Sequence, residues 1–215
     1  MLSMATTIVV AIILLLLVHS SMLTAQTTIA DEAMHAAEIA LAYYVKLTKE
    51  TGMPAEQSKK GAVGDIQLGK PYKVLTLSLE ELATATITTS ISDIIHDYHV
   101  IWFPVWQNGE IWAELEIVRR NGKWRGRSFG GGRRARQVLR ARDKIANAIK
   151  SGEADITNPD CILRVPEIGA WFISAKHKRD MKIIPITSRL DRFGLEEGKL
   201  YNSREFKHKI STIKR

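Results

Sequence analysis

Two Asn-Gly pairs, Asn108-Gly109 and Asn121-Gly122, constrain the fold of this chain more than any other feature. Asn and Gly adopt positive φ readily, so each pair favours a two-residue turn between antiparallel strands. The flanking segments YHVIWFPVW, IWAELEIV and WRGRSFG have the composition and alternation of β-strands. Residues 98–129 therefore predict a three-stranded antiparallel meander.

The middle strand of this meander alternates between two kinds of side chain. One face is wholly apolar and holds Ile111, Ala113, Leu115 and Ile117. The other face holds Trp112, Glu114, Glu116 and Val118. Because successive strand residues point to opposite faces, we expect the apolar set to lie in the core.

The segments before the meander predict one helix and one interrupted strand. Residues 29–51 carry apolar side chains at helical spacing. Residues 54–64 are small and polar, which is typical of a connector, and residues 66–77 predict a strand interrupted at Gly69 and Pro71.

Residues 78–97 are ambiguous. A Thr-rich middle disfavours one continuous helix, because β-branched side chains are restricted there. We expect a short helix or turn near Leu79–Leu82 and a second near Ser90–His96.

After the meander the apolar period changes to that of a helix. The stripe from Ala135 to Ile149 predicts a helix that runs to about Lys150. Three short strands and a loose terminal helix are expected beyond it, at residues 161–165, 170–175, 181–186 and 204–213.

These elements predict an α+β fold: an N-terminal helix and antiparallel β-meander, a following helix, and a second small set of antiparallel strands. We expect residues 1–25 to be a signal peptide or membrane anchor and residues 29–150 to form the α+β domain. Residues 151–215 are expected to be a β-strand extension packed on that domain, followed by a polar basic tail.

The N-terminal region predicts export. Ile8–Val18 is an unbroken apolar run of signal-peptide length, and no charged side chain precedes Asp31. Ala25 suits a cleavage site, whereas Leu23 occupies a position where a small residue is preferred. Cleaved signal and retained anchor therefore both stay open, and either one predicts an extracytoplasmic location for the rest of the chain.

Composition and cysteine content limit the classes of protein. Apolar residues make up 45% of the chain and charged residues 25%, which is ordinary globular composition. The lone Cys161 cannot form an intramolecular disulfide or a CxxC metal site. We interpret it as a structural thiol and expect packing to hold the domain together.

Positive charge is concentrated in part of the chain. Residues 1–118 carry a net charge of −7, residues 119–144 a net charge of +10, and the whole chain +8. Such asymmetry indicates a surface that faces an anionic partner. Because an exported protein rarely meets nucleic acid, we expect membrane headgroups, a cell-wall polymer or another envelope protein, and no nucleic acid.

The glycine-rich turn SFGGGRRAR is the candidate anion-binding site. Backbone N–H groups at a helix start and nearby guanidinium groups attract anions. The candidate residues are Gly130, Gly131, Gly132, Arg133, Arg134 and Arg136. The alternative interpretation is that glycine only permits a tight strand-to-helix turn packed close to the sheet.

Asp93, His96 and Asp97 form the candidate metal site. They would share a helical face if this stretch were helical, and carboxylates with imidazole bind divalent metals. A solvated helix end is the alternative interpretation. The acidic pairs Glu80-Glu81, Glu114-Glu116 and Glu196-Glu197 are interpreted as surface features, and no motif indicates a cofactor.

The run LGKPYKVLTLS, followed by WFPVWQNGEIWAELEIV, NGKW and FGGGRRARQVL, resembles exported bacterial domains of uncharacterised function that look like PepSY or cystatin-type modules. The resemblance covers about residues 65–150. It implies a helix packed on an antiparallel sheet and carries over no catalytic residues. The Thr-rich segment 83–90 and the arginines after the glycines depart from that pattern.

The sequence thus predicts a noncatalytic extracytoplasmic binding or interaction module with a basic surface for an anionic envelope partner. Two alternatives remain: a metal-dependent hydrolase that uses Asp93, His96 and Asp97, and a protease-inhibitory module of the PepSY type.

Overall fold

The computed structural model describes residues 30–51, 65–86, 89–150, 157–177, 180–187 and 190–211 of the 215-residue chain. The predictions for the apolar N-terminal segment, its cleavage at Ala25 and the connector at 54–64 lie outside these residues.

The strands of the described part form one nine-stranded sheet in the order β5-β4-β3-β2-β6-β7-β8-β9, with β1 also paired to β3. The strands are β1 (Ile66–Leu68), β2 (Tyr72–Leu77), β3 (Ile95–Gln107), β4 (Glu110–Arg120), β5 (Lys123–Gly131), β6 (Thr157–Val165), β7 (Ala170–His177), β8 (Asp180–Pro185) and β9 (Tyr201–Asn202). Neighbours pair antiparallel except β2 and β6, where Lys73 lies opposite Cys161 in a parallel register. That parallel pair joins the meander to the second set of strands.

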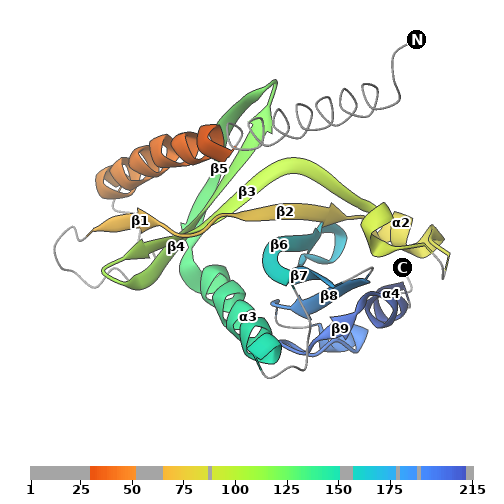
Figure 1. Cartoon of the computed structure of the whole chain (residues 1–215). Coiled ribbons are helices and arrows are strands. Elements are labelled where there is room, and N and C mark those ends of the chain that lie inside the picture. The colour runs from red at the N-terminus through yellow and green to blue at the C-terminus, as the bar shows by residue number, and fades with distance from the viewer. Residues whose placement is uncertain are drawn as a thin grey trace, which may run out of the picture.

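Helices cover the sheet from different sides. The N-terminal helix occupies residues 30–51, and the others are α2 (Leu79–Thr84), α3 (Gly132–Lys150) and α4 (Ser203–Ser211). Short 3₁₀ turns are η1 (Ile91–Asp93), η2 (Pro166–Ile168) and η3 (Asp191–Phe193). Figure 1 shows the N-terminal helix and α3 on opposite faces of the meander, with α2 and α4 beside each other at the far end.

The predicted α+β class is confirmed, and so are both turns. Asn108 and Gly109 have φ of 52° and 76°, and Asn121 and Gly122 have φ of 51° and 74°. Positive φ at both central residues defines the two-residue turn whose twist suits antiparallel strands. The strand broken between Leu68 and Tyr72 and the helix after the glycines are also as expected.

The helix or turn predicted near Ser90–His96 is confirmed at its start, where a 3₁₀ turn forms, and is wrong from Ile95 onward. The Ser90 hydroxyl and the Asp93 carboxylate cap a single 3₁₀ turn, and β3 begins at Ile95. His96 pairs with Thr76 of β2, because sheet pairing outweighs the weak local helix preference of this Ile-rich stretch.

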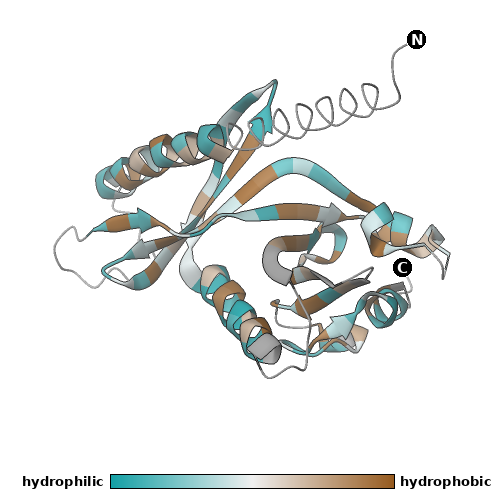
Figure 2. Ribbon diagram, in the orientation of Figure 1, coloured by the Kyte–Doolittle hydropathy of each residue, from teal (hydrophilic) through white to brown (hydrophobic). Residues whose placement is uncertain are grey.

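Three apolar clusters form the core of the part of the chain that the structure describes. One lies between the N-terminal helix and β4 and includes Ala37, Leu115 and Ile117. A second lies under α3, and a third is enclosed with α2 and α4. Figure 2 shows hydrophobic colouring along the strands and hydrophilic colouring toward the tip of the β4–β5 hairpin.

Both faces of β4 are therefore covered. The core face predicted from Leu115 is confirmed, since Leu115 is fully buried. On the opposite face Glu116 is only 6% exposed, because α3 packs against that side of the strand. A surface interpretation of the Glu114-Glu116 pair is thus wrong.

Candidate functional site

The hairpin of β4 and β5 ends in a dense group of cations. Arg120 lies directly opposite Lys123 across the two-residue turn, and Val118 lies opposite Arg125. We call Arg119, Arg120, Lys123 and Arg125 the basic hairpin tip. Like charges that face each other across two strands destabilise a hairpin, so this arrangement requires a compensating reason.

The basic hairpin tip carries unneutralised charge. Arg120, Lys123 and Arg125 are exposed, and among the described residues no carboxylate pairs with any of them. Arg119 donates its Nε–H to the carbonyl oxygen of Gly122 at 3.3 Å, which braces the turn without supplying negative charge. The hairpin tip therefore presents positive charge that no described carboxylate neutralises.

The glycine-rich turn is built for close packing. Gly130 and Gly131 end β5, and Gly132 begins α3. A Cβ at Gly132 would lie 2.9 Å from the carbonyl oxygen of Trp112. Only glycine lets the helix approach the sheet this closely, which supports the packing interpretation.

The structure does not bring the three arginines of this turn together. Arg133 is exposed. Arg136 donates from Nη1 to the carbonyl oxygen of Ile111 at 3.2 Å, and Arg134 turns under the helix toward Glu114. Anion binding by the glycines and these arginines stays a prediction, and the geometry directs two of the guanidinium groups inward.

Arg134 belongs to an internal acid–arginine cluster, which we define as Glu114, Glu116, Arg127, Arg134 and Arg164. Arg134 Nη1 lies 3.3 Å from Glu114 Oε1 and 3.8 Å from Glu116 Oε1. Arg127 Nε lies 3.8 Å from Glu116 Oε2. Both carboxylates therefore face α3 and interact with guanidinium groups at distances longer than ideal hydrogen bonds.

Burial dominates the electrostatics of this cluster. Burial raises the pKa of Glu114 to about 7. The positive charge of Arg134 and the Trp102 indole lower this pKa, whereas the negative charge of Glu116 raises it further. Burial also lowers the pKa of Arg164, and the charges of Arg127 and Arg134 act in the same direction. Glu114 therefore exchanges its proton near neutral pH.

An indole ring completes the cluster. The guanidinium carbon of Arg134 lies 4.0 Å from the ring centroid of Trp171, and that of Arg164 lies 5.7 Å from it. A guanidinium group stacks favourably on an indole face. Sequence reasoning missed this group because Trp171 reaches it only through the β2–β6 pairing; the visible signal was two glutamates on one strand face.

The candidate metal ligands have separate partners. The Asp93 carboxylate accepts the backbone N–H of Ser90 at 3.3 Å, and His96 Nε2 lies 2.7 Å from both carboxylate oxygens of Glu81. Asp97 Oδ2 lies 2.7 Å from Lys73 Nζ. In the described segments no three His, Cys, Asp or Glu side chains are grouped to hold a metal ion.

Asp97 is held in its charged form. Partial burial opposes ionisation, but the Lys73 ammonium and the backbone N–H of His99 outweigh it, so the pKa of Asp97 lies below its usual value. His99 has a φ of 53°, a left-handed conformation in which its amide reaches Asp97. This carboxylate thus stabilises an irregular part of β3.

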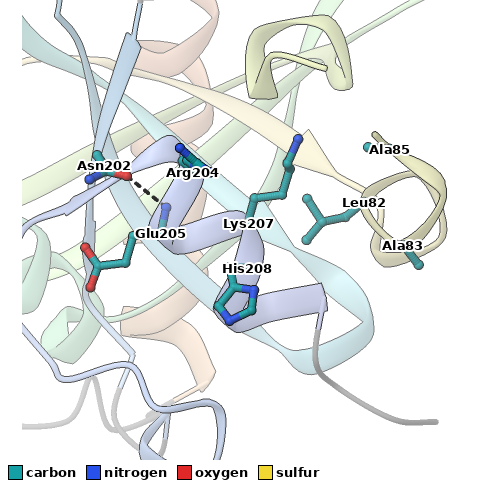
Figure 3. A pocket seen from close by; sticks show the side chains of 8 residues that line it. All are labelled: Leu82, Ala83, Ala85, Asn202, Arg204, Glu205, Lys207 and His208. Atoms are coloured by element: carbon teal, nitrogen blue, oxygen red, sulfur yellow. Dashed lines mark hydrogen bonds between the residues drawn. The ribbon is translucent and has the colours of Figure 1, made fainter. Parts of the chain in front are cut away.

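A pocket of about 660 Å³ lies between α2 and α4. Figure 3 shows its lining: Leu82, Ala83, Ala85, Asn202, Arg204, Glu205, Lys207 and His208. Lys207 is 7% exposed, and its ammonium donates to the carbonyl oxygens of Thr86 at 2.5 Å and Thr89 at 2.8 Å. The lysine therefore holds the chain that follows α2 against α4.

Cys161 and the remaining acidic pairs have structural surroundings. Cys161 carries a partly buried thiol on β6 that forms no disulfide, and its carbonyl oxygen accepts the Ser174 hydroxyl at 3.4 Å. Glu196 lies 2.7 Å from the Lys199 ammonium on the surface. The role of Cys161 as a structural thiol stays a prediction.

Comparison with known proteins found no relative. No protein-family model matches the chain, and neither a curated protein nor a solved structure gives a match. What is established is the class: an α+β protein with a mostly antiparallel sheet. Within the residues that the structure describes, no helix is long and apolar enough to cross a membrane.

Proposed function

We propose that this protein is a noncatalytic extracytoplasmic binding module that presents a basic surface to an anionic envelope component. The observation that carries the proposal is the Arg120–Lys123 pair, two cations directly opposite each other. Their mutual repulsion costs stability that an anionic partner would recover.

The scaffold behind these cations supports the proposal because it is closely packed. Phe129 of β5 stacks on Tyr44 with ring centroids 5.3 Å apart and planes 7° apart. A Cβ at Gly126 would lie 3.0 Å from the Cβ of Ala40. The hairpin is thus packed tightly on the N-terminal helix, and preorganised charges lose little entropy on binding.

A simpler explanation is that the cations protect the edge strand β5 from pairing with other chains. This explanation accounts for Arg125 and Arg127 along the edge. It also covers Arg120 in part, because β4 extends beyond its last pair with β3, Val118 opposite Val100, so that Arg120 pairs only with β5. Binding measurements separate the two explanations.

The test uses the full chain in neutral detergent with heparin as a soluble polyanionic probe. We expect the affinity to fall at least roughly tenfold between about 50 mM and about 300 mM salt, because screening weakens exposed charges. The double variant Arg120→Glu/Lys123→Glu should bind at least about tenfold more weakly than wild type at low salt.

The matched control is Lys46→Glu/Lys49→Glu, which changes the net charge equally at exposed positions of the N-terminal helix. This control should retain most of the affinity. Equal losses in both variants, or no salt dependence, would refute a specific basic site.

The alternatives from the sequence are less well supported. A hydrolase that uses Asp93, His96 and Asp97 needs the three side chains around one ion, whereas each has a different partner here. A protease-inhibitory role of the PepSY type rests on resemblance, and no contact described above favours it.

A further inference from the structure

The orientation of the basic hairpin tip follows from how β5 lies along the N-terminal helix. Phe129 contacts Tyr44, and Gly126 contacts Ala40. Trp124 and Arg125 share a groove with Ala36. Passing from Phe129 toward Lys123, the strand therefore runs toward the residue-30 end of the helix, and Figure 1 shows the hairpin tip at that red end.

The residue-30 end of the helix is where the chain arrives from its apolar run. Only 11 residues separate Val18 from Ala30, and none of them carries an acidic or strongly basic side chain. Even a fully extended chain of this length spans at most about 40 Å. If the hydrophobic segment is seated in a bilayer, this linker limits how far the residue-30 end of the helix, and the hairpin tip beside it, can lie from the membrane surface.

We propose that the basic hairpin tip binds the anionic lipid headgroups of the membrane that holds the apolar segment Ile8–Val18. This inference rests on the proposed function and names its partner. Each Lys or Arg near an anionic membrane surface strengthens attachment about fivefold, so four cations form a substantial contact. The hairpin tip thereby sets the orientation of the domain relative to the membrane surface.

Local charge favours a flat anionic surface over an extended polymer. Residues 117–127 contain five cationic side chains and no acidic one. Four of these cations are crowded around one two-residue turn and are not spread along a groove. Asp31 and Glu32 lie at the same end of the helix, where they stabilise its N-terminus, and the cations outnumber them.

The two Asn-Gly turns provide a matched pair of reporter positions. Both have the same backbone conformation, and they lie at opposite ends of β4. In a Cys161→Ser background, a fluorophore is attached at Asn121→Cys or at Asn108→Cys. Each full-length chain is reconstituted into vesicles that contain headgroup-labelled quencher lipid.

We expect strong quenching at position 121 in vesicles with roughly one-third phosphatidylglycerol and several-fold weaker quenching in pure phosphatidylcholine. Quenching should decrease with added salt and with Arg120→Glu/Lys123→Glu. Position 108 should be quenched little in both lipids. Equal quenching at the two positions, or none at position 121, overturns the inference.

The heparin experiment tests the basic site, and the vesicle experiment tests its contact with the membrane. If the hairpin variant loses heparin binding but position 121 is not quenched, the basic site stands and its partner is a soluble or wall-bound polyanion. If the variant loses neither signal, the basic-site proposal is refuted along with this inference. A chain that does not float with vesicles also overturns the membrane contact.

Discussion

Arg134 lies between an acid and an aromatic ring: its Nη1 is 3.3 Å from Glu114 Oε1, and its guanidinium carbon is 4.0 Å from the centroid of Trp171. Glu114 belongs to β4 and Trp171 to β7, on opposite sides of the β2–β6 junction. One side chain of α3 therefore links the two halves of the sheet.

Replacing Arg134 with Met should destabilise the protein by on the order of 2 kcal/mol. The change removes the guanidinium group that faces both Glu114 and Glu116 beneath the helix. Because Arg134 is partly exposed to solvent, the loss of stability is smaller than for a fully buried ion pair. Urea unfolding measures the effect. Arg133→Met, an exposed neighbour on the same turn, should change stability by less than about 0.5 kcal/mol; equal effects would mean that the cluster contributes nothing.

Glu114 should make stability depend on pH. Its folded-state pKa of about 7 exceeds the ordinary value of 4.5, so between these values the folded chain holds a proton that the unfolded chain has lost. Stability therefore falls as pH rises through this window, by roughly 3 kcal/mol in total, and changes no further above it.

Glu114→Gln replaces the titrating carboxyl group with an amide that does not titrate. The free energy of unfolding should therefore depend less on pH between pH 5 and pH 8. The variant should gain most at pH 8, where the wild-type carboxylate is charged and buried. Urea midpoints across this range test the prediction. Glu110→Gln, an exposed position at the start of the same strand, serves as control and should leave the slope intact. An unchanged slope in Glu114→Gln would contradict the assignment.

Gly132→Ala should destabilise the chain by about 1–3 kcal/mol, because the added methyl would press against the Trp112 carbonyl. Gly130→Ala is the matched comparison, since a Cβ there meets nothing within 4 Å. It should be neutral or slightly stabilising. Thermal unfolding of both variants distinguishes a packing glycine from a ligand-binding one; a tolerated Gly132→Ala would argue against close packing.

Lys207→Met should loosen the chain after α2. Losing the ammonium leaves the carbonyl oxygens of Thr86 and Thr89 without that donor, at a cost of about 1–3 kcal/mol. Hydrogen exchange should accelerate at the backbone amide of Thr89. Arg204→Met, an exposed change on the same helix, should leave exchange there unaltered; similar exchange in wild type and Lys207→Met would rule out the tether.

Local pattern predicted the elements that local chemistry controls. The Asn-Gly turns follow from residue types that accept positive φ, and the alternation around Leu115 follows from the strand period. The neighbours of His96 in the sequence favour a helix or turn. Its strand conformation depends on pairing with Thr76, which no local pattern reports.

The candidate site also has one part that the sequence predicts and one part that depends on tertiary packing. The cations of the hairpin tip are visible in the sequence, and their opposition across the turn follows from the Asn121-Gly122 pair. The inward direction of Arg134 and Arg136 was not predictable, because it depends on which face of β4 the helix α3 covers.

The sequence by itself determined the turns, the meander, the amphipathic helices and the concentration of positive charge, because each depends on neighbours within one element. Only the tertiary structure decided that both faces of β4 are buried and that Glu114, Arg134 and Trp171 meet. Those contacts depend on the parallel pairing of β2 with β6 and on the close packing of α3 against β4 at Gly132. Both features bring together segments that are remote in the sequence.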